Sequence, residues 1–419
     1  KYPYLLSPLK VRNRVLKNRI MHTRATPQFM QGSVGSYYSD VAKNAAIVTI
    51  HVSGGHQGEQ QLPSSGQREG SSAVGMGQAA QQQTPSSGQT DGANVTGMGQ
   101  SMLQQRSVST DSLDQIIEGI HCEGALAMGA RVDVGGNIGE GQQTIVGPRI
   151  SAGGTIEESI RQAKAIEAQG YDLVWVGARN LLNREEMKPV IEHMHAVRNA
   201  TNLIIVAWIL PYSPGLSRGS QQIDPFLPSG PNAQGPDLEE LVAMARLLEG
   251  SADILQMKDC GHYTNHPNSF TMETGKPWML RFSQAVKEAG INIITAPGGG
   301  FHDPALNDEW IASGKTDMVG MATPFFADPE WVSKAYDGRA EDIVPCIMCH
   351  DCHGISKTTG PWYDTCNVNP LWGLSETKKR SIRPPSGSKK VAVIGGGPGG
   401  MKAAITAAER GHRVTLYEK

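Results

Sequence analysis

Four cysteines lie close together near the C-terminal end of the sequence. Two residues separate Cys346 from Cys349 and Cys349 from Cys352, and thirteen separate Cys352 from Cys366. Each iron of a [4Fe-4S] cube takes one thiolate, and steps of two residues let a single loop wrap three corners of the cube. Structural zinc more often takes two separated Cys-x-x-Cys knuckles, a pattern that this stretch does not contain. The spacing therefore predicts a [4Fe-4S] cluster, with zinc or unliganded thiols as the alternatives.

The other thiols and the nearby histidines have simpler interpretations. Cys122 and Cys260 lie far apart, so we expect buried or incidental thiols. His350 and His353 lie between the clustered cysteines and could replace a ligand, although solvated loop histidines are the simpler interpretation. Six cysteines in 419 residues are too few for a disulfide scaffold, which indicates a metal centre in a reducing compartment.

A glycine motif with the residues of a nucleotide-binding fold follows the cysteines. VAVIGGGPGG, MKAAITAAERG and HRVTLYEK predict a strand, a glycine turn, a helix and a second strand. Gly395, Gly397 and Gly400 supply the GxGxxG spacing, and Glu418 ends the second strand, where an acid binds the adenosine ribose. The pyrophosphate would lie at the helix N-terminus, where free N–H groups and the helix dipole favour anions. This context predicts a site for a dinucleotide or for ADP.

The elements that must position these residues follow a regular order. Apolar, β-branched runs alternate with amphipathic stretches up to about residue 330, which is typical of parallel strands joined by helices. Eight such α/β units predict a TIM (β/α)8 barrel, whose chemistry lies at the C-terminal ends of its strands. The predicted strands are 18–23, 46–52, 124–132, 172–177, 203–210, 253–258, 292–297 and 317–321, and the predicted helices include Asp111–Cys122, Thr155–Gln169, Arg184–Ala200, Asp237–Glu249 and Trp278–Ala289.

A polar tandem repeat interrupts this order at residues 63–106. Its two units of 22 residues are rich in Gly, Ser and Gln, and two units cannot form a solenoid, so we expect a flexible loop or a lid over the barrel. Lys1 is not an initiator Met and Lys419 stops within the nucleotide motif, so we expect part of a longer protein. The predicted domains are a barrel at 1–340, a cluster segment at 341–377, a linker at 378–389 and the start of a Rossmann-like nucleotide-binding domain at 390–419.

Charge and hydropathy exclude several classes of partner. The 38 basic and 40 acidic residues are spread along the chain and give a net charge of -2, so there is no electrostatic footprint for nucleic acid. No apolar run reaches the roughly 18 residues that a membrane span requires, and the sequence does not open on a secretory signal. We expect a cytoplasmic protein that binds a small-molecule substrate.

Four stretches resemble a known family. They are YPYLLSPLKVRNRVLKNRI, GKTDMVGMATPFFADPEW, CIMCHDC with CNVNP, and VAVIGGGPGG. In this order they resemble the iron–sulfur flavoenzymes of the old yellow enzyme class, the NADH:flavin oxidoreductase family of 2,4-dienoyl-CoA reductase, trimethylamine dehydrogenase and the bile-acid and enoate reductases. The resemblance covers nearly the whole chain apart from the repeat. The two-residue step from Cys349 to Cys352 is more similar to the amine dehydrogenase.

The resemblance implies cofactor contacts for particular residues. It implies FMN in the barrel mouth, with its phosphate held by the loops after strands seven and eight. Those loops match Gly298, Gly299 and Gly300, and then Ala322 and Thr323, whereas Thr23, Arg24 and Ala25 match the residues that contact the isoalloxazine ring. His262 matches the histidine of the loop after strand six, with Tyr263 beside it, and either side chain could polarise a substrate carbonyl or deliver a proton.

Several family residues are replaced in this sequence. The arginine of the eighth strand is Thr323, the flavin-facing arginine of the fifth is Trp208, and the glutamine of the third falls near Ala130. The histidine pair expected after strand four is replaced by Gly177, Ala178, Arg179 and Asn180. Each change removes a hydrogen bond or a charge from the flavin or the substrate.

The resemblance implies an oxidoreductase. We expect NAD(P)H to reduce FAD, the cluster to pass electrons singly to FMN, and an activated C=C bond to be reduced. The alternatives are an amine-type dehydrogenase that sends electrons out through the cluster to an electron-transfer protein, and a barrel without flavin that serves as a binding or assembly subunit. We also expect a homo-oligomer.

Overall fold

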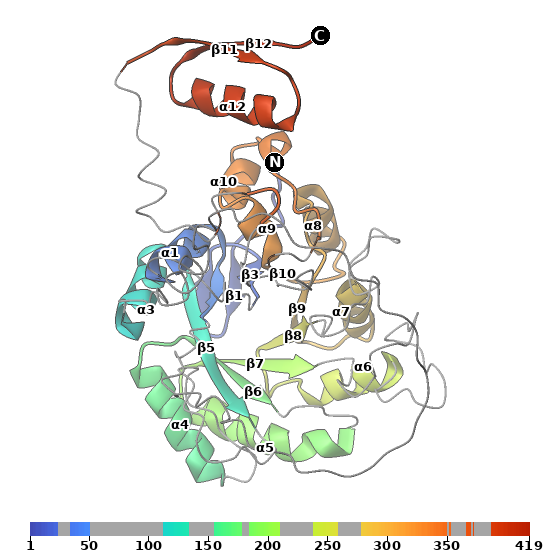
Figure 1. The fold of residues 1–419 in the computed structure, drawn as a ribbon. Helices are drawn as coiled ribbons and strands as arrows, with labels where there is room; N and C mark the ends of the chain where they lie inside the picture. The colour runs from blue at the N-terminus through green and yellow to red at the C-terminus, as the bar shows by residue number, and fades with distance from the viewer. Residues whose placement is uncertain are drawn as a thin grey trace, which may run out of the picture.

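Eight parallel strands form a closed barrel (Figure 1). They are β3 (Ile20–His22), β4 (Ile47–Thr49), β5 (Leu126–Asp133), β6 (Leu173–Gly177), β7 (Ile204–Ile209), β8 (Ile254–Lys258), β9 (Ile294–Gly298) and β10 (Val319–Met321). Each strand pairs with the next one along the chain, and β10 closes the ring against β3. The predicted barrel is therefore confirmed.

This computed structural model does not describe every part of the chain. The described residues are 1–23, 34–50, 112–133, 155–177, 184–209, 238–258, 278–349, 352, 366–369, 372 and 387–419. The tandem repeat lies outside them, so its predicted role as a loop or lid stays a prediction. The predicted domain limits also stay predictions.

Helices cover the outside of the barrel (Figure 1). All five of the predicted helices are present. One of them begins at a capping box, because the Ser112 hydroxyl accepts the Gln115 N–H and the Gln115 side chain accepts the Ser112 N–H. The helices are α1 (Val34–Asn44), α3 (Leu113–Cys122), α4 (Ile156–Ala168), α5 (Arg184–Ala200), α6 (Leu238–Leu247), α7 (Trp278–Glu288), α8 (Pro304–Ala312), α9 (Thr323–Ala327) and α10 (Trp331–Tyr336). No helix in the described ranges is both long enough and apolar enough to cross a membrane.

The strands separate two apolar layers. On β7, Ile204 and Val206 belong to the cluster inside the barrel, whereas Ile205 and Ala207 belong to the cluster between the strands and the helices. Successive side chains of a strand point to opposite faces, and here both faces are buried. This explains why the strands appear in the sequence as continuous apolar runs rather than alternating ones.

A hairpin closes the N-terminal end of the barrel. Strands β1 (Leu9–Val11) and β2 (Arg14–Leu16) pair antiparallel, and Val11 and Leu16 pack in the interior cluster. At the turn, Arg12 has a φ of 50° and donates hydrogen bonds to the carbonyl oxygens of Arg198, Thr201 and Leu203. The hairpin therefore leaves the opposite, C-terminal end of the barrel as the mouth.

Three aspartates tie neighbouring strands together near the N-terminal end. They are Asp172, Asp253 and Asp317, which come shortly before or directly before β6, β8 and β10. Each carboxylate accepts a backbone N–H from the preceding strand, at 2.9 Å for Ala127, 2.8 Å for Ile205 and 2.9 Å for Thr295. Each also pairs with basic side chains: His121 and Arg14 at Asp172, Arg198 and Arg12 at Asp253, and Lys287 at Asp317.

The C-terminal residues form the predicted strand, helix and strand. Strands β11 (Lys390–Ile394) and β12 (Arg413–Tyr417) pair in parallel and are joined by α12 (Pro398–Glu409), which is drawn in red in Figure 1. A helical crossover is the connection that two parallel strands require.

Candidate cofactor sites

All four clustered cysteines line one pocket. Cys346, Cys349, Cys352 and Cys366 meet there with residues of α9 and of the two cysteine segments. The other lining residues are Thr323, Phe326, Ile347, Met348, Asn367 and Val368. The structure therefore brings together the residues that the sequence predicted as ligands of one cluster.

Hydrogen bonds to sulfur shape this pocket. The Met348 N–H donates to Cys346 Sγ at 3.4 Å, and Asn367 Nδ2 donates to Cys349 Sγ at 3.2 Å. Met348 has a φ of 53°, so the loop turns through a left-handed residue between the first two cysteines. Such donors suit thiolate ligands, because hydrogen bonds to the sulfurs set the reduction potential of a cluster.

The electrostatics of the pocket fit a positively charged occupant. Burial raises the pKa of Cys346, against hydrogen bonds from the Met348 backbone and the Thr323 side chain. Burial raises the pKa of Cys352 more strongly, and the other three cysteines raise it further. Four thiolates in one pocket would repel one another, and the positive charge of bound iron would offset that repulsion.

Four cysteines are the ligand set that a [4Fe-4S] cluster takes. Among the residues that the structure describes, no three His, Cys, Asp or Glu side chains are arranged to hold one metal ion. In a cube each thiolate binds a different iron, so the sulfurs lie further apart than around one zinc. The cluster remains a prediction. His350 and His353 lie outside the described residues.

Aromatic side chains connect the cysteine pocket with the barrel. Phe326 lines the pocket, and its ring centroid lies 4.6 Å from that of Trp372 and 6.3 Å from that of Tyr37. The Tyr37 hydroxyl lies 3.3 Å from Nε2 of His22, which ends β3. The pocket therefore lies close to the C-terminal ends of β3 and β10, at the mouth of the barrel.

The predicted flavin residues of three strands meet at this mouth. Thr23 follows β3, Gly298 ends β9, and the Thr23 N–H donates to the Met321 carbonyl at the end of β10. A Cβ added at Gly320 would lie 2.6 Å from Thr23 Cγ2 and 2.9 Å from Gly298 Cα, so this position requires glycine. Gly320 was not among the residues predicted from the sequence, although a glycine within a strand often marks such a close approach.

The first predicted phosphate loop has an open backbone. Gly299 and Gly300 have φ values of 101° and 81°, in the left-handed region that favours glycine. A Cβ added at Gly299 would meet no atom within 4 Å. The backbone of this loop can therefore approach a ligand closely, as a phosphate site requires.

The second predicted phosphate loop, Ala322 and Thr323, also reaches the cysteine pocket. Ala322 is the N-cap of α9 and supplies no side-chain cap, whereas Thr323 lines the cysteine pocket together with Cys346. The sequence did not predict this second contact, because it depends on how the cysteine segment folds back onto α9.

Several predicted residues cannot be placed. Arg24, Ala25, His262 and Tyr263 all lie outside the described residues. Their predicted roles therefore stay predictions.

The nucleotide motif has the geometry that its glycines predict. Gly395 has a φ of 101°, and Gly397 is the N-cap of α12. A Cβ added at Gly400 would lie 1.8 Å from the Gly395 carbonyl oxygen, so the helix packs against the turn only with glycine there. The Glu418 carboxylate accepts the Gly396 N–H and thus lies beside the turn. The fold therefore suits a dinucleotide, as in the Rossmann motif.

Replacing Gly400 by alanine should weaken nucleotide binding at least about tenfold, because overpacking of about 1–3 kcal/mol would separate α12 from the turn. Calorimetric titration of the full chain with ADP measures the loss. The matched control is Gly399→Ala, since a Cβ at Gly399 meets nothing within 4 Å. Equal ADP affinities for the two variants would contradict the predicted role of Gly400.

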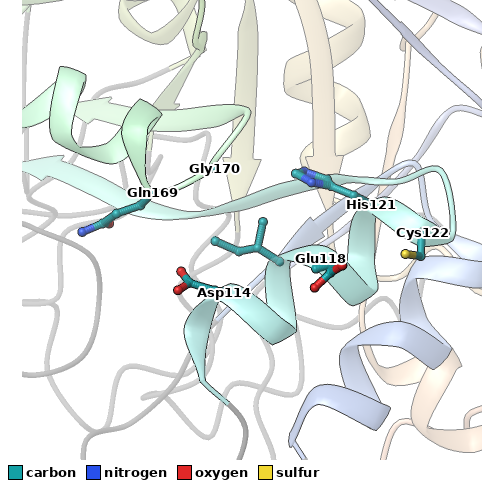
Figure 2. A pocket seen from close by; sticks show the side chains of 7 residues that line it. Asp114, Glu118, His121, Cys122, Gln169 and Gly170 are labelled. Carbon is teal, nitrogen blue, oxygen red and sulfur yellow. The ribbon is translucent and has the colours of Figure 1, made fainter.

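A separate pocket lies on the outer wall of the barrel (Figure 2). It has a volume of about 510 Å³, and residues of α3 and of the end of α4 line it. His121, one of these residues, lies 2.7 Å from the Asp172 carboxylate and thus belongs to the aspartate ties between strands. The other lining residues are Asp114, Ile117, Glu118, Cys122, Gln169 and Gly170. The sequence predicted no site here.

Known proteins are similar to parts of this chain. Residues 389–419 match a family described as pyridine nucleotide-disulphide oxidoreductase. The chain is 36% identical over 193 residues to an NADH oxidase of Thermoanaerobacter brockii, and 34% identical over 192 residues to a cinnamate reductase of Clostridium sporogenes. Each alignment covers 44% of this chain and only 28% of the relative.

Solved structures share the fold. A 2-naphthoyl-CoA reductase superposes with a TM-score of 0.63 at 20% identity, covering 99% of this chain and 64% of that one. Histamine dehydrogenase from Rhizobium sp. 4-9 superposes with a TM-score of 0.63 at 16% identity, covering 100% of this chain and 60% of that one. At these identities the likeness concerns the fold alone.

Proposed function

We propose that this chain comes from an old yellow enzyme-like flavin and iron–sulfur oxidoreductase that uses NAD(P)H to reduce an activated C=C bond. The relatives named cinnamate reductase and bilirubin reductase support this proposal. Bound FAD, the [4Fe-4S] cluster and FMN would supply the electron transfer, in the order predicted from the sequence, since flavins exchange both hydride and single electrons.

Each part of the chain has a distinct task in this proposal. The turn at Gly395–Gly400 and Glu418 hold FAD or ADP, and the four cysteines hold the cluster. The loops at Gly298–Gly300 and Ala322–Thr323 hold the FMN phosphate, and Thr23 with its two successors contacts the ring. His262 or Tyr263 would hold the substrate carbonyl or supply the proton, because both follow β8 and thus the C-terminal end of a barrel strand.

One observation supports the proposal above the others. Thr323, the second residue after β10, lines the same pocket as the four cysteines, and the Thr23 N–H in the same mouth donates to the carbonyl of Met321, the last residue of β10. Ala322 and Thr323, the two residues that follow β10, therefore lie between the candidate flavin site and the candidate cluster site. A short path between the cluster site and the flavin site is what electron transfer between these cofactors would require.

Anaerobic titration of the purified protein tests the proposal. NADH or NADPH should bleach the flavin absorbance, and cinnamate or a similar enoate should then restore it. His262→Asn should slow the second step while leaving the bleaching by NAD(P)H unchanged, because a proton donor acts only on the substrate. Bleaching that needs no nicotinamide, or a protein without flavin, would contradict the proposal.

The spacing of the cysteines favours a second candidate. The two-residue step from Cys349 to Cys352 is similar to that of an amine dehydrogenase, and a dimethylamine dehydrogenase of Hyphomicrobium is 28% identical over 144 residues. In this case an amine alone would bleach the flavin, and electrons would leave for an electron-transfer protein. The same titration with dimethylamine in place of NADH separates the two functions.

The remaining expectations belong to the proposal as well. They are a small-molecule substrate, a homo-oligomer and a cytoplasmic location. Size-exclusion chromatography with light scattering would measure the oligomeric state.

A further inference from the structure

Three polar or aromatic side chains meet inside the barrel on neighbouring strands. Trp175 on β6 belongs to the interior cluster. On β7, Trp208 lies two residues after Val206, which points into the barrel. On β8, Gln256 lies two residues after Ile254, which also points into the barrel. Because side chains alternate along a strand, Trp208 and Gln256 point inward too. Gln256 was not among the residues predicted from the sequence.

One hydrogen bond sets the orientation of the Gln256 amide. Trp175 Nε1 lies 2.9 Å from Gln256 Oε1. An indole N–H is a donor only, so the amide must present its oxygen to Trp175 and its NH₂ group elsewhere. The Trp175 and Trp208 rings are stacked, with centroids 6.1 Å apart and an interplanar angle of 27°, which restricts the movement of Trp175.

The NH₂ group of Gln256 is left without an acceptor. The residue is 1% exposed, and its Nε2 atom is buried with no hydrogen-bond partner in the described residues. A buried donor without a partner costs about 1–3 kcal/mol, so such a group indicates a ligand that completes it.

The position of Gln256 indicates which ligand this is. In the strand register Gln256 pairs with Trp208 on one side and with Ala296 on the other, two residues before Gly298 of the predicted phosphate loop. Trp208 stands where the resemblance places the flavin-facing arginine. The uncharged amide of Gln256 therefore lies directly beside the position where the resemblance places an arginine.

We propose, on the basis of the proposed function, that Gln256 Nε2 donates a hydrogen bond to a carbonyl oxygen of the flavin ring. Trp175 acts as a positioning residue that holds the amide in the donating orientation. In this arrangement the neutral amide of Gln256 on β8 takes the place of the charged arginine that the resemblance expects on β7.

Flavin affinity tests the proposal without relying on turnover. FMN binding to the full chain, measured by the quenching of flavin fluorescence, should weaken about tenfold in Gln256→Leu, because the ring carbonyl loses its donor. Gln256→Leu removes an uncompensated donor but also leaves Trp175 Nε1 without its acceptor, so thermal unfolding of the flavin-free protein serves only to show that the variant is folded. Trp175→Phe should weaken binding about threefold, and the double variant should be no weaker than Gln256→Leu alone.

A surface variant and the unmodified protein complete the test. Gln284→Leu on α7 removes an amide that donates to Glu288 Oε1 at 2.7 Å in an exposed contact, and it should leave FMN affinity unchanged. Unchanged FMN affinity in a folded Gln256→Leu variant would overturn this inference and leave the proposed function intact. Absence of FMN binding in the unmodified protein would overturn both the inference and the proposed function.

Discussion

Serine in place of Cys352 is expected to abolish the iron–sulfur cluster while the barrel stays folded. A hydroxyl is a harder and far less acidic ligand than a thiol, and each corner of the cube depends on one thiolate. Iron and acid-labile sulfide should fall from about four each per chain to nearly none. Chemical analysis of the purified protein measures both, and circular dichroism monitors the fold.

The control for this substitution is a cysteine from elsewhere in the chain. Cys122 is exposed at the end of α3, so Cys122→Ser should leave the iron content unchanged. Burial and the neighbouring thiols raise the pKa of Cys352, so the metal-free protein holds it as a neutral thiol and cluster assembly must release its proton. One zinc per chain in the unmodified protein, or full iron content in Cys352→Ser, would contradict the cluster assignment.

Alanine in place of Asp253 is expected to destabilise the barrel by about 3 kcal/mol. The Asp253 side chain is 6% exposed and accepts the Ile205 N–H at 2.8 Å, so its removal leaves a buried donor without a partner. Arg198 and Arg12 would also lose their carboxylate. Urea denaturation of the full chain, followed by circular dichroism, measures the change in unfolding free energy.

Two further variants separate the causes of this loss. Asp253→Asn keeps a carbonyl oxygen for the Ile205 N–H but removes the charge, so it should cost less than Asp253→Ala. Asp337, which is 54% exposed beside Arg339, is the matched surface aspartate, and Asp337→Ala should cost well under about 1 kcal/mol. Equal effects at the buried and the exposed aspartate would refute the view that the aspartates tie the strands together.

Local patterns in the sequence were enough to predict the barrel and both C-terminal motifs. A strand buried on both faces is apolar at most positions, so β7 appears as a continuous run from Ile204 to Ile209. The Gly395, Gly397 and Gly400 spacing reflects a turn that is complete within a few residues. The four cysteines were also grouped correctly, because three of them belong to one loop.

The positions of the three aspartates could be read from the sequence, but the strands and basic side chains that they connect could not. Asp172, Asp253 and Asp317 each stand shortly before or directly before an apolar run, in YDLVWVG, ADILQM and TDMVGM. Their partners are a backbone N–H on the preceding strand and a basic side chain on another element. The shared placement before alternate strands is therefore a signal that could have been used.

The closure of the barrel determined the rest. β10 pairs with β3, which brings Gly320 against Thr23, residues that lie at opposite ends of the barrel sequence. The contact between Thr323 and Cys346 and the bond from Trp175 to Gln256 likewise join separate elements. Residue types and local spacing report burial and turns, whereas these contacts depend on strand register around a closed ring. Only the assembled barrel therefore shows which inward-facing side chains meet at its mouth.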